Sequence, residues 1–383
     1  MAVYANYAAT SPALSPAVVK ELCEYLGGVH LNAGRNFEGL EAEAIALRAR
    51  RAIAGLFEVD DPLRVIFTSG ATQSLNMVIH GLVRQGGHVL ATSVEHNAAA
   101  RPLENLRKNG VIELDWLQCG PDGSLDAEKV RNAIKKNTRL LVMTHASNVL
   151  GTILPVTESF RIAREHGVLT ILDAAQTGGI LPFTMGKCCD VLVFAGHKGL
   201  GGLAGTGGFV IGEAASGEMR PWMSGGTGSA SHSLDMPDFM PDRFEPGTQN
   251  TIGILSLAAS VEEILRTGVE KIRDRERGLS ARFLSGLAGI KNLRPCGTLD
   301  PALSVPLVSV VVRGYDAGEV SRHLFEKYGI ITRSGLHCSP LAHRSSGTFP
   351  GGTVRFSFGS GTKEKDIDAT LEALAASSFH PKR

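Results

Sequence analysis

The sequence predicts an α/β fold with two parts, a large and mostly parallel doubly wound sheet followed by a smaller α+β part. Short apolar runs with the composition of buried strands alternate with helical stretches between residues 64 and 211. Polar residues recur directly after the ends of these runs. Beyond residue 288 the predicted order changes to β, α, β, β, α, which is typical of a separate α+β unit.

Length and charge limit the possible classes of protein. A chain of 383 residues can form a large core and two domains. The 39 Lys and Arg residues nearly balance the 38 Asp and Glu residues, so we expect no binding to nucleic acid or to a membrane surface. The first residues lack the basic and apolar regions of a secretory signal, and no apolar run approaches the roughly 20 residues of a membrane helix. The expected location is the cytoplasm.

The N-terminal part is expected to be mostly helical. Residues 6–12 resemble a short extended segment, whose small and hydroxyl residues could line a pocket. We expect them instead to cap a helix over residues 16–25. An Ala-rich helix is expected over residues 41–57. The polar loop at residues 32–36, which lies between these two helices, could face a ligand pocket.

The strand at residues 64–68 leads through Ser69-Gly70-Ala71-Thr72 directly into a helix that ends near residue 83. Free backbone N–H groups and hydroxyls at such a helix start can bind an anion, although Ser and Thr also simply cap helices. The chain has no phosphate-binding Walker motif. Further strands are expected at 88–92, 112–117, 139–144, 169–172, 191–194 and 207–211, with helices at 125–136 and 155–166.

Lys198 follows the strand at residues 191–194, on a turn that continues into a run of glycines. Open α/β sheets bind ligands at the carboxyl ends of their strands, and a partly desolvated lysine amine can attack a carbonyl group. The stretch Gly199–Ala204 fits the dinucleotide pattern, but it leads into a strand and not a helix, which excludes a Rossmann site. Taken alone, Lys198 could be a surface lysine. Other polar residues at strand ends argue for a shared site, and these are Thr72, His96, Asn148, Asp173, Gln176 and His197.

The C-terminal part begins after a long Gly-, Ser-, Met- and Pro-rich loop over residues 223–246. Gly247 and Thr248 then precede a helix through about residue 266. The remaining elements are expected as helices at 270–288, 314–328 and 363–376 and strands at 304–312, 330–333 and 354–358. We expect a large domain over residues 15–258, and a small domain made of residues 1–14 and 259–383.

The six cysteines show no C-x-x-C spacing, so neither a disulfide framework nor a zinc knuckle is indicated. Cys338 lies in a polar loop beside His337 and near arginines, and cationic neighbours favour the nucleophilic thiolate. An incidental loop cysteine is the simpler alternative. A metal site with His337 and His343 would need at least one more ligand.

In combination, these motifs resemble the cysteine desulfurase branch of the class V aminotransferases, which are fold-type I enzymes that depend on pyridoxal 5'-phosphate (PLP). The matching motifs are Thr-His-Ala-Ser-Asn148-Val-Leu-Gly-Thr, Asp173-Ala-Ala-Gln, Gly-His-Lys198-Gly and Arg-Ser-Gly-Leu-His-Cys338. The last of these is similar to the SufS-like subgroup, which has a short cysteine loop. The resemblance runs from Tyr4 to about Gly359.

The resemblance implies a role for each matching residue. Lys198 would hold PLP covalently and later move the α-proton of the substrate, and Asp173 would pair with the ring nitrogen so that the ring can accept electrons. His96 would stack on the ring and could transfer protons. Arg355 would bind the substrate carboxylate with two hydrogen bonds, and Cys338 would attack the substrate sulfur. The remaining contacts would be Gln176 and Asn148 near the phenolic oxygen, and Ala71, Thr72, His197 and the neighbouring subunit's copies of Gly247 and Thr248 at the phosphate.

The implied activity is conversion of L-cysteine to L-alanine, with the sulfur passed as a Cys338 persulfide to an acceptor protein or thiol, in a homodimer with shared sites. Selenocysteine lyase, cysteine sulfinate desulfinase, transaminase and non-catalytic scaffold remain alternatives. The chain departs from the family pattern at Ala195, where relatives often carry a hydroxyl that helps to bind phosphate, and at Leu203, where proline is common. Loss of one neutral hydrogen bond at residue 195 is worth about 0.5–1.5 kcal/mol.

Overall fold

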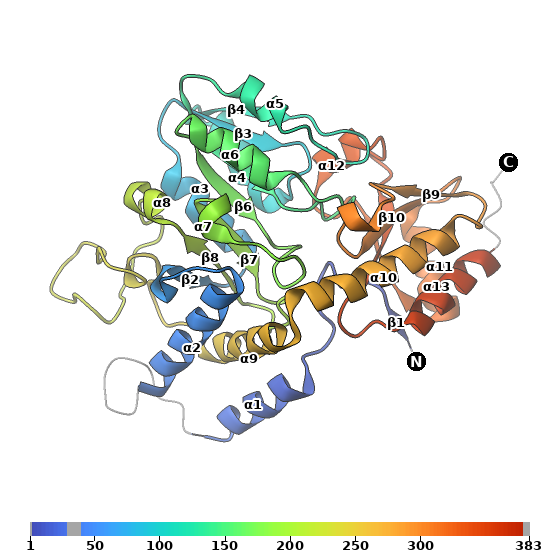
Figure 1. The fold of residues 1–383 in the computed structure, drawn as a ribbon, viewed down its shortest axis with the longest axis horizontal. Helices are drawn as coiled ribbons and strands as arrows, with labels where there is room; N and C mark the ends of the chain where they lie inside the picture. Colours follow the sequence, from blue (N-terminus) through green and yellow to red (C-terminus); the bar gives the residue numbers. More distant parts are fainter. Residues whose placement is uncertain (1, 29–39, 378–383) are drawn as a thin grey trace.

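The computed structural model describes residues 2–28 and 40–377, so the polar loop at 32–36 lies outside the described residues. At its centre is a seven-stranded sheet, here called the large sheet, with helices on both faces (Figure 1). Neighbouring strands are parallel except at β8, which is antiparallel to both neighbours. The predicted, mostly parallel sheet is confirmed. In spatial order its strands are β2 (Val65–Thr68), β8 (Gly207–Ile211), β7 (Val191–Ala195), β6 (Leu169–Asp173), β5 (Thr138–Thr144), β3 (Gly87–Thr92) and β4 (Ile112–Leu117).

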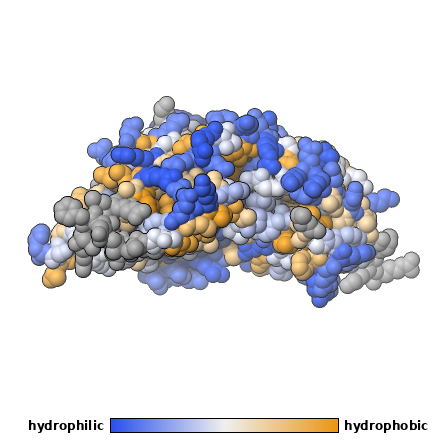
Figure 2. Space-filling model, turned by 90° about the horizontal axis from the view of Figure 1, so that it is seen from below, coloured by the Kyte–Doolittle hydropathy of each residue, from blue (hydrophilic) through white to orange (hydrophobic). Residues whose placement is uncertain are grey.

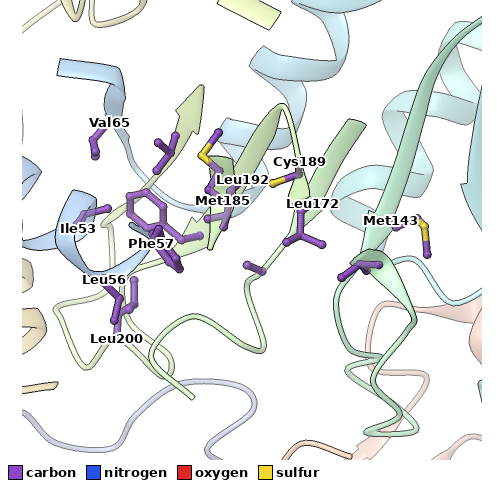
Figure 3. Packing of buried hydrophobic residues seen from close by; sticks show 14 of the residues in the cluster. Ile53, Leu56, Phe57, Val65, Met143, Leu172, Met185, Cys189, Leu192 and Leu200 are labelled. Atoms are coloured by element: carbon purple, nitrogen blue, oxygen red, sulfur yellow. The ribbon is translucent and has the colours of Figure 1, made fainter. Parts of the chain in front are cut away.

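The large sheet is buried on both faces because alternate residues of its strands enter two separate apolar clusters. In β5, Leu141 and Met143 belong to one cluster, and Leu140 and Val142 belong to the other. The first cluster is drawn in Figure 3, where Phe57 packs among strand residues of this layer. The helices that contribute to it include α1 (Pro16–Leu26), α2 (Leu40–Leu56), α5 (Glu128–Ala133), α6 (Val156–Glu165), α7 (Met185–Cys188) and α9 (Thr251–Thr267). The second cluster is covered by α3 (Ala71–Leu82), α4 (Asn97–Lys108) and α8 (Glu213–Glu218).

A four-stranded antiparallel sheet, here called the small sheet, lies at the other end of the molecule (Figure 1). Its strands in spatial order are β12 (Arg333–Gly335), β13 (Thr353–Ser357), β10 (Leu307–Val312) and β9 (Leu293–Cys296). Its apolar cluster includes residues of α10 (Val269–Leu287), α11 (Ala317–Tyr328) and α13 (Glu364–Ala376). The N-terminal strand β1 (Val3–Tyr4) pairs with β11 (Ile330–Ile331), and α13 packs against the small sheet, so the first and last described elements lie in the same part of the molecule.

Several predicted elements have slightly different bounds in the structure, and two differ in a way that has a clear cause. The helix expected at 125–136 shortens to α5, because the backbone N–H of Lys135 donates to the Thr138 hydroxyl and turns the chain into β5. The strand expected at 330–333 is interrupted at Thr332, since β11 pairs with β1 while β12 pairs with β13. The sequence analysis did not anticipate α4, α7, α8, β9 or α12 (Pro340–Ser345).

The surface mixes hydrophilic and apolar residues. Figure 2 shows this interspersion on the lower face of the molecule as drawn in Figure 1. Among the described residues, no helix combines the length and apolar character needed to cross a membrane.

Candidate active site

A pocket of about 320 Å³ lies where the carboxyl ends of the central strands meet the start of α3 and the edge of the small sheet. Nine predicted site residues line it: Ala71, Thr72, His96, Asn148, Asp173, Gln176, His197, Lys198 and Arg355. Three predicted residues do not. Cys338 is exposed in the loop that follows β12, and the exposed Gly247 and Thr248 lie outside this pocket.

The start of α3 forms the anion-binding end of the pocket. Its N-cap is Gly70, and no side chain caps the first turn, so backbone N–H groups there are available to an anion. The φ angle of Gly70 is 151°, which favours glycine. A Cβ at Gly207 would lie 2.6 Å from the Gly70 Cα, so the neighbouring strand also needs glycine at this point. Thr72 and Ala195 line the same end.

The backbone at Lys198 is held by the N-terminal segment. The Ser11 hydroxyl donates to the Lys198 carbonyl at 2.9 Å, and the Ser11 N–H donates to the His197 carbonyl at 2.9 Å. Thr10 Oγ1 lies 3.0 Å from Nδ1 of His197. The expectation that hydroxyls of residues 6–12 cap the first helix was therefore wrong, because Ser15 caps α1. Instead, Thr10 and Ser11 fix the turn that carries the lysine.

The surroundings of Lys198 favour its neutral, nucleophilic form. Burial lowers the pKa of Lys198 to about 8, and the nearby Asp173 carboxylate opposes this shift. Burial raises the pKa of Asp173, while a hydrogen bond from the Ala175 N–H and the Lys198 charge lower it. An amine and a carboxylate therefore face one small cavity from adjacent strand ends.

His96 both caps a helix and lines the pocket. Its Nδ1 accepts a hydrogen bond from the Ala98 N–H at 3.0 Å, so it caps α4. It also lines the pocket. Burial lowers the pKa of His96 to about 4, and Lys198 adds to this effect. The ring is thus neutral near pH 7, and because Nδ1 is an acceptor, its proton resides on Nε2.

Asn148 and Gln176 line the pocket, but both side-chain amides already have partners. Gln176 Nε2 donates to the Ala8 carbonyl at 3.1 Å. Asn148 Nδ2 donates to the His337 carbonyl at 2.7 Å, and Asn148 Oδ1 accepts from the Ser339 hydroxyl at 2.6 Å. Asn148 therefore connects the pocket to the loop that carries the cysteine.

Arg355 is a buried cation, 1% exposed, with hydrogen bonds only to neutral groups. Nη1 donates to the Asn148 carbonyl at 2.9 Å and Nη2 to Asn6 Oδ1 at 3.1 Å, while Nε has no hydrogen-bond partner. Burial lowers the pKa of Arg355 to about 9, and Arg333 lowers it further. A buried guanidinium with a free donor is well suited to bind a ligand carboxylate.

The Cys338 thiol lies next to Arg333 and not against the His337 imidazole. Arg333 Nη2 is 3.7 Å from Cys338 Sγ, and the Arg333 side chain lines the pocket. His337 is turned inward, with Nε2 3.1 Å from Thr353 Oγ1. Burial lowers the pKa of His337 to about 2, so this histidine is uncharged and is not the cationic neighbour that the sequence suggested.

The alternative metal site finds no support among the described residues. There, no group of three His, Cys, Asp or Glu side chains is arranged to hold a metal ion. His343 is fully buried, and its Nδ1 is 2.6 Å from Thr348 Oγ1.

Sequence reasoning gave no specific role to Arg333, Asn6, Thr10 and Ser11. Arg333 belongs to the quoted motif that ends at Cys338, but its function depends on strand register, since it lies opposite Arg355 in the β12–β13 pair. Asn6 reaches Arg355 through a contact between residues 349 positions apart. No local sequence signal carries that information.

A larger cavity of about 430 Å³ shares Lys198, Ala175, Gln176 and Ala8 with the pocket, on the side toward α9 and α10. Its lining lacks Asp173 and the start of α3. The smaller pocket is therefore the one that combines an amine, a carboxylate and an anion-binding helix start.

This donor set fits PLP. The Lys198 amine can bind an aldehyde, Asp173 can pair with a pyridine nitrogen, and the uncapped start of α3 can hold a phosphate. The pocket has polar groups for each of these three functions.

Comparisons with known proteins agree with this chemistry. Residues 3–370 match the family model of class-V aminotransferases. The chain is 32% identical to a probable cysteine desulfurase of Methanothermobacter thermautotrophicus over 97% of this chain and 94% of that protein. It is 34% identical to a cysteine desulfurase of Escherichia coli over 72% of this chain and 68% of that protein.

Two solved structures are similar over nearly the whole chain. The apo cysteine desulfurase of Thermococcus onnurineus superimposes with a TM-score of 0.90 at 28% identity, covering 98% of this chain and 94% of that one. The cysteine desulfurase CsdA of Escherichia coli gives a TM-score of 0.88 at 25% identity, with 97% and 94% covered. The chain therefore belongs to the class-V aminotransferase family, in its PLP-dependent cysteine desulfurase branch.

Proposed function

We propose that this protein removes sulfur from L-cysteine, releases L-alanine, and carries the sulfur as a persulfide on Cys338. The observation that carries the proposal is the position of the thiol. Cys338 Sγ is 3.7 Å from Arg333 Nη2, and Arg333 lines the same pocket as Lys198. An exposed thiol beside a cation, at the edge of a PLP-type pocket, is placed to act as a nucleophile.

The chain's own residues account for substrate binding and proton transfer. Arg355 binds the substrate carboxylate through its unpaired Nε and the guanidinium edge. Lys198, with its lowered pKa, takes the α-proton as a neutral amine and returns it as an ammonium. Bound PLP supplies the electron sink for this chemistry.

Sulfur transfer is proposed to occur at Cys338. Its thiolate forms a bond to the substrate sulfur while the bond between that sulfur and the substrate Cβ breaks. The remaining three-carbon fragment takes up a proton at Cβ and leaves as alanine. Because Cys338 is exposed, the persulfide is then accessible to an acceptor protein or a small thiol.

Substitution of Cys338 by Ala tests this function. We expect Cys338→Ala to bind PLP with an unchanged visible spectrum and to lose cysteine turnover, while Cys23→Ala retains it because Cys23 is on α1. Rates on selenocysteine and cysteine sulfinate identify the alternatives, because those leaving groups can depart without a thiol. Undiminished turnover of cysteine by Cys338→Ala would exclude the persulfide.

We further propose a homodimer in which Gly247 and Thr248 reach the partner's phosphate site. In support, both residues are exposed and do not line the pocket of their own chain. Thr248 lines a cavity next to this pocket, and Ser69 and Gln73 line both. Light scattering on the PLP-bound protein should give twice the monomer mass, and Thr248→Ala should weaken PLP binding. A monomeric active enzyme would contradict the shared site.

We also propose that the chain divides into a large domain over residues 15–258 and a small domain of residues 1–14 and 259–383. The pairing of β1 with β11 supports the assignment of the first residues to the small domain. Because Ala258 is buried inside α9, limited proteolysis should cut at the exposed end of this helix near Thr267 and leave a large N-terminal fragment if the two domains are separate units.

A further inference from the structure

The backbone of the loop that carries Cys338 adopts a conformation that contacts with other parts of the protein must stabilise. The φ angles of His337 and Cys338 are 48° and 59°, so two consecutive non-glycine residues occupy the left-handed region. Such conformations cost free energy and persist only where neighbouring groups enforce them. The position of the thiol therefore depends on what the loop is bound to.

Three hydrogen bonds attach this loop to the large-sheet side of the molecule, one at each of three consecutive residues. The His337 carbonyl accepts from Asn148 Nδ2 at 2.7 Å, and the Cys338 carbonyl accepts from the Asn97 N–H at 2.7 Å. The Ser339 hydroxyl donates to Asn148 Oδ1 at 2.6 Å. One carboxamide, that of Asn148, thus binds the residues on both sides of the cysteine.

Ser339 does not have the function that its place in the chain suggests. It occupies the N-cap of α12, but its side chain makes no capping hydrogen bond. The hydroxyl is fully buried and is directed to Asn148 instead. Because Asn148 lines the pocket and its carbonyl also accepts from Arg355, the Ser339 bond joins the cysteine loop to the pocket wall.

We propose that Ser339 is a positioning residue for sulfur transfer, which acts through Asn148 to hold the Cys338 thiol at the pocket. Without the hydroxyl, Asn148 Oδ1 loses its donor, and its amide is free to rotate away from the His337 carbonyl. The loop then leaves its strained conformation, and the thiol is more accessible to solvent but less often placed against the substrate. This inference rests on the proposed function of Cys338 as the nucleophile.

The test compares Ser339→Ala with the wild type in the full-length, PLP-bound protein. Peptide mass spectrometry follows iodoacetamide alkylation of Cys338, with the exposed Cys23 as an internal reference. We expect Cys338 to be alkylated about five- to tenfold faster and kcat for cysteine to fall by a similar factor, as the loss of one hydrogen bond predicts. KM, the visible spectrum of PLP and Cys23 alkylation should not change.

Two variants separate positioning from a general loss of packing. Ser346→Ala removes another buried hydroxyl of the same segment. This hydroxyl lies 2.9 Å from Thr348 Oγ1 and does not contact Asn148, so neither the alkylation rate of Cys338 nor kcat should change. Ser339→Thr keeps a hydroxyl and should restore both rates at least in part. If Ser339→Ala does not fold, Asn148→Asp provides the same alkylation test, because it removes the donor to the His337 carbonyl.

Wild-type alkylation and wild-type kcat in Ser339→Ala would overturn the proposal, and so would equal effects in Ser346→Ala. Failure of the proposed function gives a different result, since Cys338→Ala would then retain cysteine turnover. The alkylation rate reports on the loop in either case.

Discussion

Arg333 and Arg355 lie directly opposite each other on β12 and β13, with both side chains at the pocket. Among the described residues, neither forms an ion pair with a carboxylate, and Arg333 contacts only the Cys338 sulfur while Arg355 contacts neutral groups. Two guanidinium groups that line one pocket without a carboxylate partner favour the binding of an anion there. The substrate carboxylate is the anion that the proposed reaction supplies.

Arg355→Lys should therefore weaken cysteine binding more than it slows the chemical step. Lysine keeps the charge but loses the planar fork that can form two hydrogen bonds with a carboxylate. A charge-assisted hydrogen bond is worth about 1.5–3 kcal/mol, so kcat/KM should fall about 10- to 100-fold, mostly through KM. Steady-state kinetics measure this. Arg344→Lys, at an exposed arginine that stacks on Phe349, is the matched control and should leave KM unchanged.

The lowered pKa of Lys198 predicts how fast apoprotein captures PLP at different pH values. Only the neutral amine attacks an aldehyde, and a pKa of about 8 leaves about a tenth of the groups neutral at pH 7 and half at pH 8. The rate of covalent capture should rise about fivefold between these values and level off above pH 9. Stopped-flow absorbance after mixing apoprotein with PLP measures it. A rate that still rises about tenfold between pH 8 and pH 9 would indicate an ordinary lysine.

Glu95 should make the stability of the apoprotein decrease with rising pH. This carboxyl is fully buried between the ends of β3 and β5, where Oε1 accepts from the Thr144 N–H and the Thr92 hydroxyl, and Oε2 has no partner. Burial raises the pKa of Glu95 to about 8, so the folded state keeps a proton that the unfolded chain releases above its ordinary pKa. The stabilisation is complete below about pH 4.5 and is lost as the pH rises to about 8.

Glu95→Gln isolates this effect because the amide keeps the acceptor Oε1 but cannot ionise. Relative to the wild type, the variant should gain about 2–3 kcal/mol in free energy of unfolding between pH 5.5 and pH 7.5. Urea denaturation of the two apoproteins at both pH values measures it, with the exposed Glu326→Gln as a control. Parallel pH dependence in wild type and Glu95→Gln would show that the carboxyl is ionised in the folded protein.

The predicted site residues that the structure brings into one pocket include those that directly follow a strand. Asp173 ends β6, and Lys198 follows β7 by a short turn, so the parallel order of the strands brings both to one edge of the sheet. Contacts between segments that are far apart in the chain could not be predicted from the sequence. Ser11 binds the Lys198 carbonyl across 187 positions, and Ser339 binds Asn148 across 191.

The direction in which a side chain points could not be predicted from the sequence either. His337 and Cys338 are neighbours in sequence, yet the imidazole is buried against Thr353 while the thiol is exposed. The loop backbone decides this, because both residues have positive φ angles that no local pattern indicates. The same limit applies to Gly247 and Thr248, whose proposed partner is a second copy of the chain.

Substitution of Ala195 by serine is expected to strengthen PLP binding. Ala195 is buried at the end of β7 and lines the pocket near the start of α3, where the family resemblance leads us to expect a hydroxyl. Ala195→Ser should add one hydrogen bond to the PLP phosphate and lower its dissociation constant about two- to tenfold, since one neutral hydrogen bond contributes about 0.5–1.5 kcal/mol. Titration of apoprotein with PLP measures this constant. Ala174→Ser places a hydroxyl in the apolar cluster instead, where it cannot reach the pocket, so it should bring no gain. If both variants bind PLP as the wild type does, the phosphate is held away from residue 195, and the departure from the family pattern there has no effect on cofactor affinity.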